Sequence, residues 1–127
     1  MGQTLLIVDD EAHIRMLLEQ TLEELEDEDV NFLSAENGEE ALEIIQKENP
    51  QLVFLDVMMP KMNGMEVCRR VKKELSMDKV FIVLLTAKGQ ELDRQKGIEV
   101  GADLYMTKPF DPETILKKAR EVLGLDA

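Results

Sequence analysis

The sequence predicts an α/β fold with three layers: a five-stranded parallel sheet covered by helices on both faces. Short apolar runs alternate five times with segments of helical periodicity along the 127 residues. Most of these runs are apolar at consecutive positions, which is typical of strands that are buried on both faces. The segments between the runs are long enough for right-handed helical crossovers, so the strands should be parallel.

Composition indicates a single globular domain over residues 1–127, because 44% of the residues are hydrophobic and 33% are charged. A net charge of −12 argues against direct nucleic-acid binding and against an anionic membrane surface. With only Cys68, no internal disulfide can form. Since neither a signal peptide nor a long apolar span is evident, we expect a soluble, cytoplasmic protein.

The first two βα units occupy residues 4–48. Thr4–Val8 is the first strand, and Asp10 is a candidate N-cap for the helix after it. Val30–Ala35 alternates in polarity and should be an edge strand, followed by a helix over Glu39–Glu48. The expected inner positions of the first helix are Ile14, Leu17, Leu18, Leu22 and Leu25. Those of the second are Ala41, Leu42, Ile44 and Ile45. The acidic run over residues 23–29 should be a solvated helix end and loop.

The third unit contains the most apolar strand, Leu52–Asp56, which ends in a carboxylate. A loop with proline and glycine follows over residues 57–64, and Met65–Leu75 should be helical. The predicted inner face of this helix comprises Val67, Cys68, Val71 and Leu75. The side chains predicted to face water are Arg69, Arg70, Lys72 and Lys73.

The last two units start with strands over Val80–Leu85 and Ala102–Met106. The helix between them, Gln90–Val100, is the least apolar one and should end at Gly101, which suits a left-handed C′ position. Asp111 should cap the final helix, with Pro112 in its first turn. The inner stripe of that helix should comprise Ile115, Leu116, Ala119, Val122 and Leu123.

Polar side chains follow four of the strands: Asp9 and Asp10, then Asp56, Thr86 and Lys108. The carboxyl ends of parallel strands share one edge of the sheet, so these groups converge if the first and third strands are neighbours. Clustered carboxylates suit Mg²⁺. A metal ion, a free carboxylate oxygen, a hydroxyl and an ammonium are the parts needed to accept a phosphoryl group. Each residue alone has a plainer interpretation as a helix cap or surface lysine, but their common position favours one site.

The motifs over the whole chain resemble those of one family, the receiver domains of bacterial two-component response regulators, and among them the chemotaxis regulators. The matching segments are Asp9-Asp10, residues 55–60 around Asp56, Asn63-Gly64, Thr86-Ala87, residues 101–103 and residues 105–110. The resemblance implies a flavodoxin-like (βα)₅ fold with strand order 2-1-3-4-5. That order makes the first and third strands neighbours.

The resemblance also implies a role for each motif residue. Asp56 would be the phosphoacceptor, and Lys108 and Thr86 would bind the phosphoryl oxygens. Mg²⁺ would be bound by Asp10 and Asp56, by Asp9 mainly through water, and by the backbone carbonyl of Met58. Movement of Thr86 would let the ring of Tyr105 turn inward and so change the surface of the fourth helix, fifth strand and fifth helix. The 108–109 peptide bond would be cis, and Met58 and Lys88 would tune the phosphoryl lifetime.

The expected partners are a sensor histidine kinase or phosphotransfer protein, a downstream effector domain or protein, and a second copy in a phosphorylation-dependent homodimer. The donor histidine would belong to the partner, since we interpret His13 as a surface residue. One alternative is an unphosphorylated interaction scaffold. A haloacid-dehalogenase-like phosphatase is a weaker alternative, because the general acid expected two residues after Asp56 is Met58. A flavodoxin-like cofactor binder is disfavoured, because it needs a Gly/Ser/Thr phosphate loop after the first strand and Asp9-Asp10-Glu11 would repel a phosphate there.

Overall fold

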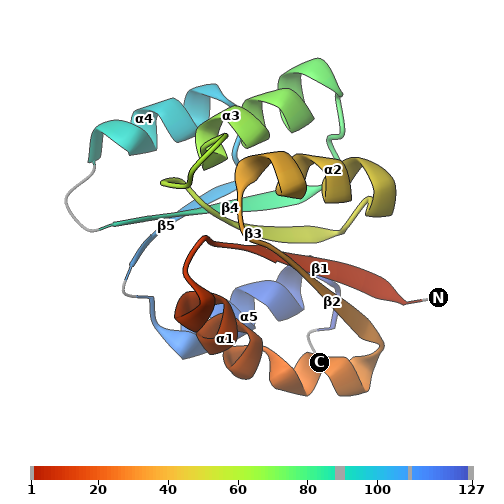
Figure 1. The fold of residues 1–127 in the computed structure, drawn as a ribbon. Helices are drawn as coiled ribbons and strands as arrows, with labels where there is room; N and C mark the ends of the chain where they lie inside the picture. Colours follow the sequence, from red (N-terminus) through yellow and green to blue (C-terminus); the bar gives the residue numbers. More distant parts are fainter. Residues whose placement is uncertain (1, 88–90, 109, 126–127) are drawn as a thin grey trace.

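Five parallel strands form one sheet in the computed structural model, which describes residues 2–87, 91–108 and 110–125 (Figure 1). The strand order is β2-β1-β3-β4-β5, as the sequence predicts. The strands are β1 (Gln3–Val8), β2 (Val30–Ala35), β3 (Leu52–Asp56), β4 (Phe81–Ala87) and β5 (Leu104–Lys108). The register of β1 with β3 brings Val8 opposite Leu55, so both strands end at the same level.

Helices cover both faces of the sheet: α1 and α5 lie on one face, and α2, α3 and α4 on the other (Figure 1). Their bounds are α1 (Ala12–Thr21), α2 (Gly38–Glu48), α3 (Gly64–Arg69), α4 (Glu91–Glu99) and α5 (Pro112–Val122). A 3₁₀ helix (Glu23–Glu28) follows α1, and a π-helical turn (Arg70–Glu74) continues α3. In the described part of the chain no helix has the length and apolar character that spanning a membrane requires.

Side-chain caps define where three of the helices begin. The Asn37 side chain accepts a hydrogen bond from the Glu40 N–H at α2, and Asn63 accepts one from Glu66 at α3. Asp111 caps α5 by accepting from the Glu113 N–H, as predicted. Asp10 does not cap α1, because Glu11 occupies the N-cap position without a side-chain bond. The Asp9 side chain instead bonds the backbone just before the helix: its Oδ1 accepts a hydrogen bond from the Glu11 N–H at 2.9 Å.

The core has two halves, one on each face of the central strands. Alternate residues of β1 and β3 point into opposite halves. Leu6, Val8, Val53 and Leu55 pack with α2 and α3, whereas Leu5, Ile7, Leu52 and Phe54 pack with α1 and α5. All eight side chains are buried, which agrees with the continuous apolar runs in the sequence.

Two predicted inner leucines and one predicted surface lysine are placed differently in the structure. Leu17 and Leu75 are 44% and 41% exposed, whereas only 8% of the Lys72 side chain is exposed. The π-helical turn explains the α3 errors, because the Leu75 N–H bonds the carbonyl of Arg70, five residues back. The wider turn shifts the helical phase, so Leu75 leaves the inner face. In α1 the inner stripe passes through Leu18, and Leu17 lies beside it.

The last two strands extend further toward their carboxyl ends than the sequence suggests. β4 includes Thr86 and Ala87, and β5 begins at Leu104 and ends at Lys108. The N–H of Ala102 instead bonds the Gly97 carbonyl at the end of α4. Gly101 has φ of +92°, which agrees with the predicted left-handed helix end. As a result, Thr86 and Lys108 are held by strand pairing.

Candidate functional site

Three carboxylates meet where β1 and β3 end. Asp9 and Asp10 follow β1, Asp56 ends β3, and one oxygen from each lies within 4.8 Å of the other two. Asp9 and Asp56 are buried, whereas Asp10 is exposed. The strand order explains the cluster, because β1 pairs directly with β3. The convergence predicted from the sequence is therefore confirmed for these three residues.

Lys108 reaches the same cluster from the far edge of the sheet. Its Nζ donates hydrogen bonds to Asp9 Oδ2 at 2.9 Å and to Asp56 Oδ1 at 3.1 Å. The Asp9 carboxylate thus has both oxygens engaged, since Oδ1 accepts from the Glu11 N–H. Asp10 is the most open member, and three carboxylates against one ammonium leave two net negative charges.

The environment shifts the pKa values of two of these groups. Burial, followed by the negative charge of Asp9, raises the pKa of Asp56 to about 6. Burial opposes the charge on Lys108, but the hydrogen bonds to Asp9 and Asp56 outweigh that effect and raise the pKa of its ammonium. At neutral pH the site therefore combines an ionised, poorly hydrated Asp56 with a charged Lys108.

The donor set fits a hard divalent cation. Carboxylate oxygens are the ligands that Mg²⁺ prefers, and the exposed Asp10 leaves one side of the cluster open to water. The excess of two negative charges would be neutralised by one such ion. Asp9, Asp10 and Asp56 would hold it. The Met58 side chain is 61% exposed, and the role of its backbone carbonyl stays a prediction.

Thr86 lies on β4, which pairs with β3, and Tyr105 lies on β5, the next strand outward. Thr86 is 2% exposed, and in the β4–β5 register it lies opposite Thr107, one residue before Lys108. Tyr105 is half-buried on β5. Gly97 of α4 packs so closely against the Tyr105 ring that a Cβ there would lie 3.1 Å from Cδ2. The tyrosine therefore touches the helix that the switch hypothesis requires to respond.

Two glycines allow close backbone contacts with the loop after β3 and with the end of β3. A side chain at Gly64 would collide with the Asp56 carbonyl, and one at Gly38 would collide with the Met62 carbonyl. The loop after β3 is thus packed between Asp56 and the start of α2. Lys88 and Pro109 lie outside the described residues, so their predicted roles stay predictions.

The sequence interpretation missed Arg15 and misplaced Lys72. Arg15 Nη1 donates to the backbone carbonyl of Asp9 at 2.6 Å, and only 15% of its side chain is exposed. A signal for it exists in the sequence, because a cation in the first turn of a helix opposes the helix dipole and needs a tertiary partner. For Lys72, nothing local reveals that the π-helical turn directs its side chain inward.

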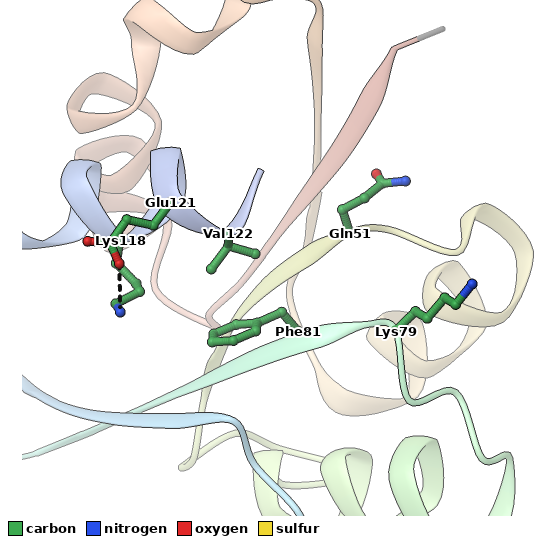
Figure 2. Close-up of a pocket in the computed structure, with 6 residues that line it drawn as sticks. All are labelled: Gln51, Lys79, Phe81, Lys118, Glu121 and Val122. Carbon is green, nitrogen blue, oxygen red and sulfur yellow. Dashed lines mark hydrogen bonds and ion pairs between the residues drawn. The ribbon is translucent and has the colours of Figure 1, made fainter. Parts of the chain in front are cut away.

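A separate hollow lies at the opposite, amino-terminal edge of the sheet (Figure 2). Its lining residues are Gln51, Lys79, Phe81, Lys118, Glu121 and Val122. The Lys118 ammonium pairs with the Glu121 carboxylate at 3.0 Å. The three clustered carboxylates lie at the other edge of the sheet, so this hollow is not part of the candidate site.

Comparison with known proteins agrees with the geometry. The family model "Response regulator receiver domain" matches residues 5–120. The chain belongs to this family. Its members are signalling proteins and not classical enzymes.

The relatives of this receiver chain include transcriptional regulators. It is 48% identical over 121 residues to "Probable transcriptional regulator ycf27" of Porphyra purpurea, covering 95% of this chain and 47% of that protein. It is 42% identical to the alkaline phosphatase synthesis regulatory protein PhoP of Bacillus subtilis, covering 97% and 49%. The chain thus spans about half the length of these relatives.

Solved structures confirm the fold of the receiver domain. The chemotaxis response regulator CheY4 of Vibrio cholerae has a TM-score of 0.81 and 34% identity, covering 96% of this chain and 99% of that one. The flavodoxin-like architecture and the likeness to chemotaxis regulators, both implied by the sequence motifs, are therefore confirmed.

Proposed function

We propose that this receiver domain accepts a phosphoryl group on Asp56 from a phosphohistidine of a sensor histidine kinase or phosphotransfer protein, in a reaction that depends on Mg²⁺. The main support is that the Lys108 ammonium bonds both Asp9 and Asp56, while the Asp10 carboxylate beside them is exposed to solvent. This arrangement provides an ionised nucleophile and a cation that can follow charge onto the incoming group.

In this reaction an Asp56 carboxylate oxygen attacks the phosphorus, a P–O bond forms, and the P–N bond to the donor imidazole breaks. The product is an acyl phosphate on Asp56 and a free histidine on the partner. Lys108 would hydrogen bond to the phosphoryl oxygens, and the buried Thr86 hydroxyl would donate to one of them. Hydrolysis of the acyl phosphate would end the signal, assisted by the same site.

Mg²⁺ would be held by Asp9, Asp10, Asp56 and the backbone carbonyl of Met58. When bound, the ion neutralises charge on the phosphoryl oxygens and lowers the barrier to attack by an anion. Asp9 already uses both carboxylate oxygens in bonds to Glu11 and Lys108, which favours contact with the ion through water. Asp10 and Asp56 would then make the direct contacts.

The proposed switch couples Asp56 to the α4–β5–α5 surface. Thr86 would move onto the phosphoryl group, and the ring of Tyr105 would turn into the space that it leaves. Because the ring packs against Gly97, its movement would release a contact that holds α4. Phosphorylation would thereby favour one member of an existing pair of conformations.

The output would be delivered by an effector domain or protein, or by a phosphorylation-dependent homodimer, in the cytoplasm. Relatives of about twice this length are named as transcriptional regulators, which favours a DNA-binding effector outside these residues. The net charge of −12 disfavours direct DNA contact by the receiver itself.

The test is the intact mass of the chain after incubation with acetyl phosphate and Mg²⁺. We expect a gain of one phosphoryl group that is absent in Asp56→Asn and in a metal-free sample. Labelling that survives Asp56→Asn would show that another residue is the acceptor. A folded, unlabelled protein would instead favour the interaction scaffold.

A further inference from the structure

Arg15 links the acidic cluster to the neighbouring loop after β2. Its Nη1 donates to the Asp9 carbonyl oxygen at 2.6 Å, and its Nη2 lies 3.4 Å from Glu36 Oε1. Arg15 lies in the first turn of α1, and its own N–H bonds the Glu11 carbonyl. The guanidinium therefore reaches back along the chain to the peptide group from which the acidic residues project.

The position of this arginine is unfavourable for the helix alone. The amino end of a helix carries partial positive charge, so a cation in the first turn is disfavoured there. The side chain is nevertheless largely buried, with 15% of it exposed. The contacts with the Asp9 carbonyl and Glu36 must therefore offset both desolvation and the helix dipole, which indicates a role in the tertiary structure.

The bonded carbonyl belongs to the peptide group that joins Asp9 to Asp10. Because a peptide group is planar, fixing its oxygen also fixes the direction in which the Asp10 backbone continues. The β1–β3 pairing ends at Val8, and the Asp9 N–H bonds the Ala35 carbonyl at 3.2 Å. Arg15 thus bonds the carbonyl side of Asp9, and its Nη2 also lies near the exposed Glu36 carboxylate.

We propose that Arg15 is a positioning residue that holds the Asp9–Asp10 peptide so that the exposed Asp10 carboxylate faces Asp56 for cation binding. This inference rests on the proposed function and names a determinant of the same site. Without Arg15, the Asp10 carboxylate samples more orientations, and binding must then order it. Loss of such outer contacts commonly weakens metal binding by ten- to a hundredfold.

The sign of the effect separates positioning from simple electrostatics. Arg15 is a cation near an acidic site, so its charge alone opposes binding of a second cation. Removing it by Arg15→Ala would tighten Mg²⁺ binding if charge were its only influence. Positioning predicts the opposite, a loss of about tenfold in affinity.

The experiment is an Mg²⁺ titration of the chain followed by amide NMR, which reports affinity and folding in the same spectra. Arg120→Ala is the matched control, because Arg120 also joins two glutamates and a backbone carbonyl, those of Glu24, Glu28 and Leu125. We expect about tenfold weaker binding for Arg15→Ala, a smaller loss for Arg15→Lys, and unchanged affinity for Arg120→Ala. Arg15→Gln replaces the alanine variant should that one fail to fold.

Equal or tighter Mg²⁺ binding by folded Arg15→Ala would overturn the inference, as would an equal loss in Arg120→Ala. Labelling of the unaltered chain by acetyl phosphate tests the proposed function separately. A chain that is labelled on Asp56 but keeps its Mg²⁺ affinity in Arg15→Ala would refute only the role of Arg15.

Discussion

Two partly buried lysines, Lys108 and Lys72, form ion pairs that differ in net charge. Lys108 bonds Asp9 and Asp56 at the carboxyl edge of the sheet, with Asp10 close by. Lys72 bonds one carboxylate, Asp103, at 2.8 Å and the Val80 carbonyl at 2.6 Å. The first cluster keeps an excess of negative charge and the second is balanced.

Burial of a charged side chain therefore does not by itself identify a functional site. The Lys72 pair is complete: Asp103 Oδ2 also accepts the Ile82 N–H, so the pair joins the π-helical turn after α3 to the starts of β4 and β5. The Lys108 cluster is incomplete, and its excess charge raises the pKa of Asp56 alongside burial. We interpret the Lys108 cluster as binding machinery and the Lys72–Asp103 pair as structural.

The largest expected effect is on phosphorylation. Lys108→Met should slow labelling by acetyl phosphate about a hundredfold or more, because it removes a donor to the developing charge on the phosphoryl group. Time courses of intact mass measure the rate. Lys72→Met is the control and should stay within about twofold, so an equal loss in both variants would contradict the comparison.

At the balanced Lys72–Asp103 pair we expect the substitution to change stability rather than phosphorylation. Lys72→Met should lower the free energy of unfolding by roughly 2–3 kcal/mol, since it leaves Asp103 with an unmatched charge. The loss is below that of a fully buried pair because 30% of the Asp103 side chain is exposed. Urea denaturation measures it, with the exposed neighbour Lys73→Met as control. A loss no larger than that of the control would argue against a structural role.

Asp56→Asn should stabilise the metal-free protein by about 2–3 kcal/mol at pH 7. The folded-state pKa of Asp56 is raised from 3.8 to about 6, so ionisation costs the folded state more than the unfolded one. Wild-type stability is therefore lost as the pH rises from about 4 to about 6, and the variant avoids this loss. Denaturation at pH 4 and pH 7 tests the sign, because the advantage should vanish at pH 4. Added Mg²⁺ should reduce it at pH 7.

The smallest effect is expected at an exposed pair. Hydrogen bonds from Arg69, then Arg70, lower the pKa of Glu66 to about 2. This stabilisation is present above the ordinary pKa of 4.5 and is lost as the pH falls toward 2. Arg69→Gln should raise the Glu66 pKa in an NMR titration while hardly changing denaturation at pH 7, because solvent screens the pair. A stability loss as large as that of Lys72→Met would break the distinction between exposed and buried pairs.

The candidate site was largely predictable because its residues lie at strand ends. Apolar runs identify the strands locally, and the residue that follows each run lies at the carboxyl edge of a parallel sheet. The sequence predicts that Asp9, Asp10 and Asp56 lie together if the first and third strands are neighbours, and the resemblance to receiver domains implies that strand order. The spacing of side chains does not reveal the partners of Arg15, a backbone carbonyl and a glutamate of another βα unit, and the only sequence signal is a cation in the first turn of a helix.

The amino-acid sequence alone predicts the five strands, the helix cap at Asp111 and the types of residue at the site, because these depend on local periodicity and on a side chain that bonds nearby backbone. Only the tertiary structure decided which charges are compensated. The bonds of Lys108 to Asp9 and Asp56 span 99 and 52 residues, and the inward turn of Lys72 follows from a π-helical turn. Burial and Coulomb energy depend on distance in space, which the order of residues along the chain does not specify.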